Sequence, residues 1–155
     1  MKWVEYENYH ITLKFLGESK TALSAINDKL SLAAQACPEF DLTFCGIGFF
    51  PSRHRPRVIW IGTGGEIDKA LFLGERIDTY LSEIGFEPEK SRNFHLTLGR
   101  IRSDKNLDSI QIQAGEIERD FQSIPYKVKK FYLMESQLSP QGPKYLLKKE
   151  YVLQG

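Results

Sequence analysis

The sequence predicts a single two-lobed, pseudo-symmetric α+β domain over residues 1–155, with antiparallel sheets lining a central cleft and helices outside. Two observations favour this class. The pattern aromatic-His-aliphatic-Thr-Leu occurs twice, at residues 9–13 and at residues 94–98. The expected elements follow one another as strand, helix, strand, strand, helix, strand, helix and hairpin, with no linker between them. A domain in which each lobe contributes one copy of the pattern to a shared cleft accounts for both observations.

Length, charge and cysteine content narrow the class of protein. A chain of 155 residues is one ordinary domain, and such a domain buries about 70% of the surface of its unfolded chain. The net charge of +1 is too small to attract nucleic acid or a membrane to the protein as a whole. An anionic ligand must therefore be recognised by a local group of residues. There is no charged-then-apolar leader and no apolar run near about 18 residues, so we expect a cytoplasmic protein without a membrane partner. Cys37 and Cys45 lack metal or redox spacing and are interpreted as small apolar residues in a reducing compartment.

The first part of the chain is expected to form two strands with a helix between them. Residues 3–16 are interpreted as an approach and a strand, which Gly17 ends. Apolar residues at helical spacing predict a helix that stops at Pro38, and alternating apolar and polar residues predict a strand over 40–49. The apolar stripe of the helix and its candidate N-caps are Leu23, Ile26, Leu30 and Ala33, with Ser19 or Thr21 as the cap.

A polar loop at residues 50–57 carries three arginines, the third histidine of the chain and two prolines. Arginine forks match phosphate oxygens, so this loop could steer a phosphodiester backbone. A solvated basic loop with no ligand is the other interpretation, and both stay open. His54 lacks the His-x-Thr context and is left out of the candidate catalytic set.

The second part of the chain is expected to contain two more helices around the second copy of the pattern. The glycines at 62–65 match a phosphate-binding loop only weakly, so we expect an ordinary turn between a strand and a helix there. The predicted elements are a buried strand over 58–62, a helix over 67–84 ended by Gly85, a strand at 94–98, a helix over 107–117 capped by Ser103 or Asp104, and a hairpin of residues 128–138 and 145–153 with its turn at 140–143.

The two histidines of the repeated pattern are the candidate catalytic pair. On an extended strand His10 and Thr12 project to one face while their apolar neighbours project to the other, and His95 and Thr97 do the same in the second copy. An imidazole can hold or release a proton near neutral pH, but a reaction that removes one proton and delivers another needs two such groups. Only three histidines occur in the chain, and two of them fall in this pattern.

Arg100 extends the candidate site. Its odd separation from His95 would place it on the other face of a regular strand, but Gly99 permits a bulge that brings the guanidinium back. An ordinary surface arginine is the alternative on this argument alone.

Residues 10–17 (HITLKFLG) and 95–100 (HLTLGR) resemble the two signature motifs of the two-histidine (2H) phosphoesterases, in particular the bacterial and archaeal RNA 2′,3′-cyclic phosphodiesterases, also known as 2′-5′ RNA ligases. Further similarity at 56–60 (PRVIW), Ser136-x-Leu138 and Gly142-x-x-Tyr145 extends the resemblance over nearly the whole chain. The resemblance implies the 2H phosphoesterase fold and no cofactor.

The same resemblance implies a role for each candidate residue. His10 corresponds to the general acid and His95 to the base that activates water. Thr12 and Thr97 correspond to the hydroxyls that hold the phosphate, and Arg100 to the arginine that follows the second motif. These are the groups that opening a cyclic phosphodiester needs: a base, an acid, and donors for the phosphoryl oxygens.

The function implied is hydrolysis of RNA 2′,3′-cyclic ends to 2′-phosphomonoesters without a metal, with RNA ends or a cyclic nucleotide as the partner. Three alternatives stay open. The same site run in reverse would be a 2′-5′ RNA ligase acting, for example, on tRNA fragments. The chain could also be a non-catalytic module that binds RNA ends. A metal-dependent hydrolase is disfavoured, because two histidines without a third His, a Cys or paired carboxylates nearby make a poor closed zinc site.

The start of the chain departs from the family resemblance. Members of the family usually begin with an apolar strand and a helix before the first motif, whereas only residues 1–9 precede His10. Unpaired strand edges and bare apolar faces are unfavourable. We therefore expect an upstream segment in the native protein or a second copy of the chain, bound as a dimer through the exposed N-terminal lobe.

Overall fold

The computed structural model describes residues 1–155 and divides into two compact units, each assembled from three separate stretches of chain. Unit 1 comprises Met1–Thr12, Leu42–Gly65 and Asn93–Tyr126. Unit 2 comprises Leu13–Asp41, Glu66–Arg92 and Lys127–Gly155. The candidate residues His10, Thr12, His95, Thr97 and Arg100 therefore all belong to unit 1.

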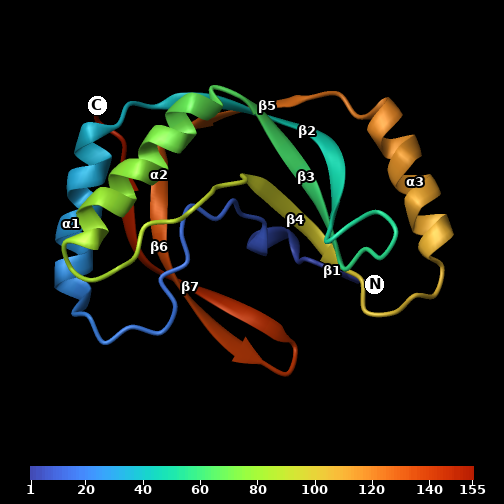
Figure 1. Cartoon of the computed structure of the whole chain (residues 1–155), viewed down its shortest axis with the longest axis horizontal. Helices are drawn as coiled ribbons and strands as arrows, with labels where there is room; N and C mark the ends of the chain where they lie inside the picture. Colours follow the sequence, from blue (N-terminus) through green and yellow to red (C-terminus); the bar gives the residue numbers. More distant parts are fainter. The chain divides into compact units, whose positions relative to one another are not determined.

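A five-stranded sheet forms most of unit 1 (Figure 1). Its strands are ordered β1-β4-β3-β2-β5, and β4 pairs antiparallel with both β1 and β3, as β3 does with β2. The outermost strands are short, which limits the exposed hydrogen-bonding edge. The strands are β1 (Lys2–Trp3), β2 (Phe40–Phe50), β3 (Val58–Gly65), β4 (His95–Arg100) and β5 (Ile124–Val128).

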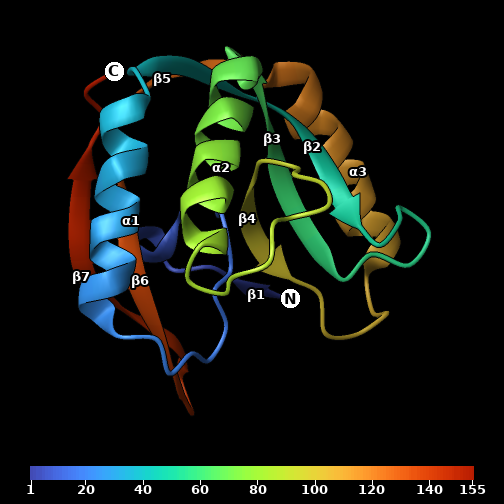
Figure 2. The ribbon, with the colours of Figure 1, turned by 60° about the vertical axis from the view of Figure 1, so that its left-hand side comes forward.

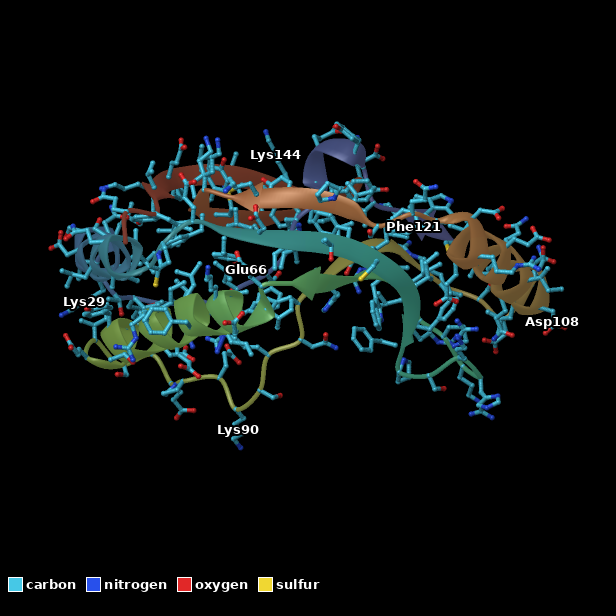
Figure 3. The ribbon with its side chains drawn as sticks, turned by 90° about the horizontal axis from the view of Figure 1, so that it is seen from above. Lys29, Glu66, Lys90, Asp108, Phe121 and Lys144 are labelled. Carbon is cyan, nitrogen blue, oxygen red and sulfur yellow. The ribbon has the colours of Figure 1, made fainter.

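Side chains alternate between the two faces of this sheet along each strand, so the two faces carry different sets of residues. Ile47 and Phe49 of β2 pair with Ile61 and Ile59 of β3 and so share one face. Helix α3 (Leu107–Asp120) covers that face, and Ala114 joins its core (Figures 2 and 3). The core consists of Ile47, Phe49, Ile59, Ile101 and Ala114, with Leu98, Leu107 and Ile110 packed against it. The opposite face of the sheet does not contribute to this core.

Unit 2 contains two helices and a hairpin (Figure 1). Helix α1 (Leu23–Ala36) packs against α2 (Ile67–Ser82) and against β7 (Gly142–Val152), which pairs with β6 (Lys130–Ser139). Each helix presents an apolar stripe to the interior, as its 3.6-residue period dictates. The buried members are Ile26, Leu30, Ala33 and Ala34 of α1 and Ala70, Leu73, Ile77 and Leu81 of α2.

The predicted α+β class with antiparallel sheets is confirmed, and so are the positions of the helices. Helix α2 ends at Ser82, two residues before the predicted end at residue 84, and Gly85 adopts a positive φ of 98° in the turn that follows. The C-terminal hairpin also forms, with its turn at residues 140–141 between β6 and β7. None of the helices is both long enough and apolar enough to cross a membrane.

The strand predicted after an approach within residues 3–16 does not form as a paired strand. After β1, the chain turns through the 3-10 helix Tyr6–Asn8 and returns to the sheet only at Ile11, which forms an isolated bridge with Leu96. The local hydrogen bond from the Asn8 amide to the Glu5 carbonyl takes the place of ladder bonds. Apolar alternation alone cannot distinguish an edge segment of this kind from a paired strand.

Other local predictions also differ from the structure. Strand β3 continues through the glycines to Gly65, so no strand-to-helix turn begins at residue 62. Ala22 and Asn106 precede α1 and α3, and neither helix has a side-chain cap, so the cap predictions at residues 19, 21, 103 and 104 are wrong. Strand β5 was not anticipated as a separate element; its mostly exposed residues have little apolar signal.

Candidate active site

The first histidine motif lies beside β4 as an interrupted continuation of β1. The Val4 amide donates to the Leu98 carbonyl at 2.8 Å, and the next contact along β4 is the antiparallel bridge between Ile11 and Leu96. The sequence predicts that each lobe supplies one copy of the histidine pattern. In the structure, both histidines lie in unit 1 instead.

The bridge sets which residues of the two copies face each other. An antiparallel register continued by one residue on either side of this bridge would set His10 opposite Thr97 and Thr12 opposite His95. Side chains directly opposite one another in such a pair have Cβ atoms about 4.5–5.5 Å apart and share a face. This register would bring two imidazoles and two hydroxyls to the face opposite to that of Ile11 and Leu96.

Both imidazoles are held by the same backbone contact. His10 Nδ1 lies 2.7 Å from the carbonyl oxygen of Asn8, and His95 Nδ1 lies 2.9 Å from that of Asn93. Because a carbonyl oxygen only accepts hydrogen bonds, Nδ1 carries a proton in each ring. Nε2 is thereby the nitrogen that gains or loses a proton in both histidines. A matched pair of this kind can supply one acid and one base.

Aromatic side chains surround His95. Its ring lies 5.1 Å from the Phe50 ring in an edge-on arrangement and 5.9 Å from the Trp60 ring, measured between centroids. Phe50 and Trp60 contact each other at 5.1 Å. Gly48 makes room for the indole, because a Cβ there would lie 2.0 Å from Trp60. The ring of His95 is thus fixed by packing as well as by the Asn93 carbonyl.

A bulge in β4 carries Arg100 to the histidine face. Thr97 pairs with Trp60, but Gly99 pairs with the neighbouring Ile59, so β4 has one residue more than β3 across this step. Arg100 then pairs with Val58, which lies two residues from Trp60 and shares its face. The bulge expected at Gly99 is confirmed, and it corrects the odd spacing between His95 and Arg100.

Exposure fits a site that meets a ligand from solvent. His10 and Arg100 are exposed, and Thr12, His95 and Thr97 are half-buried. Within the described chain, no group of three His, Cys, Asp or Glu side chains is arranged to hold a metal ion.

The Arg53–Arg57 loop makes local contacts within unit 1. Arg53 forms an ion pair with Glu118 at 3.2 Å, and its guanidinium lies over the Phe49 ring; Arg57 forms an ion pair with Asp104 at 3.0 Å. These partners are exposed. The loop's interpretation as a phosphate-steering element stays a hypothesis.

The sequence interpretation missed the two asparagine carbonyls and the aromatic wall at Phe50 and Trp60. A signal for the first was present, since each copy begins two residues earlier as Asn-aromatic-His, at Asn8 and at Asn93. A residue repeated at the same offset indicates a repeated contact, although the contact in the structure is made by the main-chain carbonyl of each asparagine and not by its side chain. Nothing in the sequence pairs the aromatic residues with His95, because the β2 and β3 register brings them there.

Comparison with known proteins identifies relatives over most of the chain. Residues 1–60 and 65–145 match the family described as LigT like Phosphoesterase. An RNA 2′,3′-cyclic phosphodiesterase of Aeropyrum pernix is 36% identical over 147 residues, which cover 94% of this chain and 82% of the relative.

Solved structures show the same fold. A protein of Thermus thermophilus has a TM-score of 0.78 at 24% identity, covering 99% of this chain and 82% of that one. Escherichia coli LigT complexed with 3′-AMP has a TM-score of 0.69 at 24% identity, covering 99% of this chain and 81% of that one.

Proposed function

The chain belongs to the LigT-like phosphoesterase family, and we propose that it hydrolyses 2′,3′-cyclic phosphodiester ends of RNA to 2′-phosphomonoesters. The observation that carries this proposal is the matched pair of imidazoles. His10 and His95 are each held through Nδ1 by the carbonyl oxygen of the asparagine two residues earlier, which leaves Nε2 of each ring for proton transfer. The relatives named RNA 2′,3′-cyclic phosphodiesterase support the choice of substrate.

The reaction needs one proton removed and one delivered. His95 Nε2 takes a proton from water as the water oxygen forms a bond to phosphorus. The bond between phosphorus and the 3′ oxygen breaks, and His10 Nε2 donates its proton to that oxygen. His95 ends protonated and His10 neutral, and exchange with solvent restores both. Each proton transfer of this kind contributes roughly 10²–10⁴ to the rate.

Thr12, Thr97 and Arg100 complete the site by binding the phosphoryl oxygens. Each threonine lies opposite one of the histidines, so its hydroxyl can donate to an oxygen of a phosphate held between the two rings. Arg100 adds a positive charge on the same face, where charge-assisted hydrogen bonds are stronger than neutral ones. Preorganised donors of this type stabilise charge as it shifts in the transition state.

We propose that the reaction proceeds without a metal or other cofactor. The support is the donor set, since the described side chains form no three-ligand cluster and two imidazoles already meet both proton-transfer needs. Turnover that persists unchanged in a chelator agrees with this proposal. Loss of turnover on chelation, with recovery on adding a divalent cation, would contradict it.

The cellular location, the assembly and the substrate range of the protein are also proposals. Two free cysteines agree with the cytoplasm as the compartment. RNA ends are the proposed partner, and 2′-5′ ligation would use the same residues with an RNA hydroxyl in place of water. A dimer through the N-terminal lobe would show itself as a mass twice that of the chain in solution.

The experiment that tests the function is a turnover assay with 2′,3′-cyclic, 3′,5′-cyclic and 2′-5′-linked dinucleotides, with product analysis by phosphorus NMR. We expect turnover of the 2′,3′-cyclic substrate to the 2′-phosphate. Binding without turnover would favour an RNA-end binding module. A 3′-phosphate product would reverse the assignment of the leaving oxygen.

A further inference from the structure

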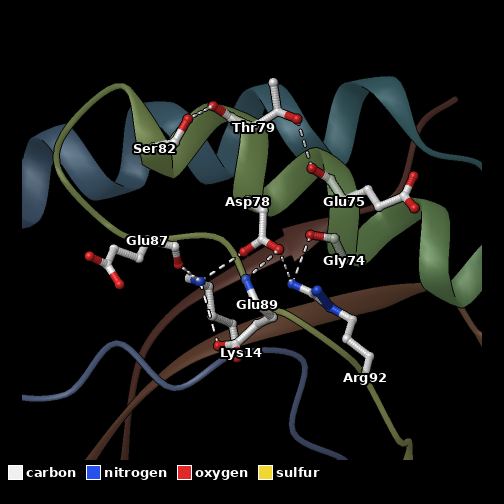
Figure 4. Close-up of polar contacts among 9 residues, drawn as sticks. All are labelled: Lys14, Gly74, Glu75, Asp78, Thr79, Ser82, Glu87, Glu89 and Arg92. Atoms are coloured by element: carbon white, nitrogen blue, oxygen red, sulfur yellow. Dashed lines mark hydrogen bonds and ion pairs between the residues drawn. The ribbon is translucent and has the colours of Figure 1, made fainter.

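Unit 2 contains a buried carboxylate that the proposed reaction does not use. Asp78 on α2 is 6% exposed and is the buried charged residue of the chain. Lys14 Nζ lies 2.7 Å from its Oδ1, and Arg92 Nη2 lies 2.7 Å from its Oδ2 (Figure 4). The Glu89 amide also donates to Oδ2, at 3.1 Å. The side chains of Lys14 and Arg92 are 5% and 8% exposed, so both cations are buried where they meet the carboxylate.

Lys14 makes further contacts beside Asp78. Besides Asp78, its ammonium donates to the Glu87 carbonyl at 2.6 Å and lies 3.5 Å from Glu89 Oε1 (Figure 4). The ammonium thus makes two hydrogen bonds and one further ion pair within this group. The segment between α2 and the second histidine motif is thus attached at several points to Lys14 and Asp78.

Gly74 shows that the position of Arg92 is built into α2. Arg92 Nη2 donates to the Gly74 carbonyl at 3.0 Å, and a Cβ on Gly74 would lie 2.2 Å from Arg92 Nε. Glycine is unfavourable inside a helix because of its backbone entropy. Its presence in the middle of α2 is explained by the guanidinium that lies against the helix backbone at this point.

The residues that meet on Asp78 flank the two histidine motifs. Lys14 comes two residues after Thr12, where the chain leaves the first motif. Arg92 directly precedes Asn93, whose carbonyl accepts the Nδ1 hydrogen bond of His95. One carboxylate therefore holds the chain just after one motif and just before the other.

We infer that Asp78 is a positioning residue for both histidines, acting through Lys14 and Arg92. It touches neither substrate nor the reacting atoms. Its effect is to fix the backbone on which Thr12 and Asn93 lie, and displacement of a catalytic group by about 1 Å can cost about 100-fold in rate. The activity readout of this inference rests on the proposed function, whereas its spectroscopic readout does not.

The test replaces the charges by apolar side chains, combining Lys14→Met, Asp78→Leu and Arg92→Met. Apolar replacement of a complete buried ion group is often tolerated by the fold, whereas removing a single partner leaves an unpaired charge. We expect cooperative unfolding to persist and kcat to fall about 10- to 100-fold with a smaller change in KM. Nitrogen-15 NMR of both imidazoles should show Nδ1 losing the signal of a fixed, hydrogen-bonded N–H.

One single variant tests the Arg92 contact by itself, and a second serves as the matched control. Gly74→Ala moves Arg92 but keeps every charge, so we expect the His95 signals to change while the His10 signals persist. Glu83→Gln removes the exposed ion pair with Lys29 in the same unit and should leave kcat and both imidazoles unchanged.

Three outcomes decide the inference. A folded triple variant with wild-type kcat and unchanged imidazole signals would overturn it. If the triple variant does not fold, Gly74→Ala decides, and an unchanged His95 signal in that variant would overturn the inference. Absence of turnover by the wild-type chain would reject the proposed function alone, because the imidazole signals still report positioning.

Discussion

At the scale of single residues, the site depends on main-chain oxygens as much as on side chains. The carbonyls of Asn8 and Asn93 set which nitrogen of His10 and His95 exchanges its proton. Neither contact can be removed by changing the asparagine side chain. The residues that can be tested directly are the hydroxyls opposite each imidazole.

Thr12→Val and Thr97→Val should each lower kcat/KM about 10- to 100-fold. Each change removes a hydroxyl but keeps the shape and the strand preference of the side chain. A hydrogen bond to a charged group contributes about 1.5–3 kcal/mol, which corresponds to that loss in rate. Steady-state kinetics with a 2′,3′-cyclic dinucleotide measures it. Thr43→Val, in β2 of the same unit, is the control, and equal rates in all three variants would contradict the assigned roles.

At this scale, the sequence was sufficient to select the five candidate residues but not their contacts. The repeated His-x-Thr spacing marks side chains that share a face where the backbone is extended. The orientation of the rings could not be derived, because the carbonyl that accepts from Nδ1 depends on the backbone path through Asn8 and Asn93.

At the scale of elements, the residues of β2 and β3 alternate between a face that packs into the core and a face that contacts His95. One face carries Phe49 and Ile59 into the core beneath α3. The other carries Phe50 and Trp60 to His95. Gly48 lies against the indole of Trp60, so a substitution at Gly48 tests how the packing of these rings affects the site.

Gly48→Ala should push Trp60 away from its place and disturb His95. A Cβ at Gly48 would lie 2.0 Å from the indole, and overpacking of this kind costs about 1–3 kcal/mol. We expect a lower free energy of unfolding and a kcat reduced by about 10-fold, measured by denaturant titration and steady-state kinetics. Gly115→Ala, in α3 with nothing within 4 Å of the added Cβ, should leave kcat unchanged and stabilise the helix. A fully active Gly48→Ala variant would contradict the packing argument.

A second test at this scale concerns Tyr151, which joins β7 to α1 by donating to Asn27 Oδ1. Burial raises the pKa of Tyr151 to about 12. Since this lies above the ordinary value of about 10, the folded state holds the proton more tightly. Its contribution to stability is fully present below about pH 10 and is lost as the pH rises toward 12, by about 2–3 kcal/mol.

Tyr151→Phe should therefore change the alkaline limb of the stability curve. At about pH 9 we expect the variant to be less stable by about 1 kcal/mol, because Asn27 loses its donor. At about pH 11.5 the order should reverse, because only the wild-type residue titrates. Urea unfolding across this range measures both values, and a difference independent of pH would contradict the argument.

Most elements could be predicted from the sequence, and the failures among the strands share one cause. The helices and the hairpin follow from apolar period and from glycine at turns. The path of residues 3–16 and the strand β5 could not be derived, because edge segments are defined by the partner they find and not by their own pattern. The same holds for the course of β3 through its glycines, which depends on pairing with β2.

At the scale of the whole molecule, the two units are interleaved along the chain. Each is assembled from three separate stretches, and β2 and β5 each begin in one unit and end in the other. A continuous hydrogen-bonded strand that belongs to both units cannot lose its order in one without consequence for the other. We therefore expect a single cooperative unfolding transition.

Leu73→Ala tests this expectation. Leu73 lies in unit 2 and is 0% exposed, so its truncation should cost about 2.7–5 kcal/mol. Both tryptophans, Trp3 and Trp60, lie in unit 1. We expect tryptophan fluorescence and far-UV circular dichroism to shift together to lower denaturant. A fluorescence transition that stays at its wild-type midpoint would show that the units unfold independently.

The most direct test of the account is the pH dependence of kcat/KM for a 2′,3′-cyclic dinucleotide in the wild type, His10→Ala and His95→Ala. The proposed active form has His95 neutral and His10 protonated, so the wild-type rate should fall on both sides of an optimum. Each alanine variant should lose about 10²–10⁴ in rate, with His95→Ala losing the acidic limb and His10→Ala the basic limb. A wild-type profile with one limb, or a variant that keeps both limbs at nearly full rate, would contradict the assignment of these two histidines as base and acid.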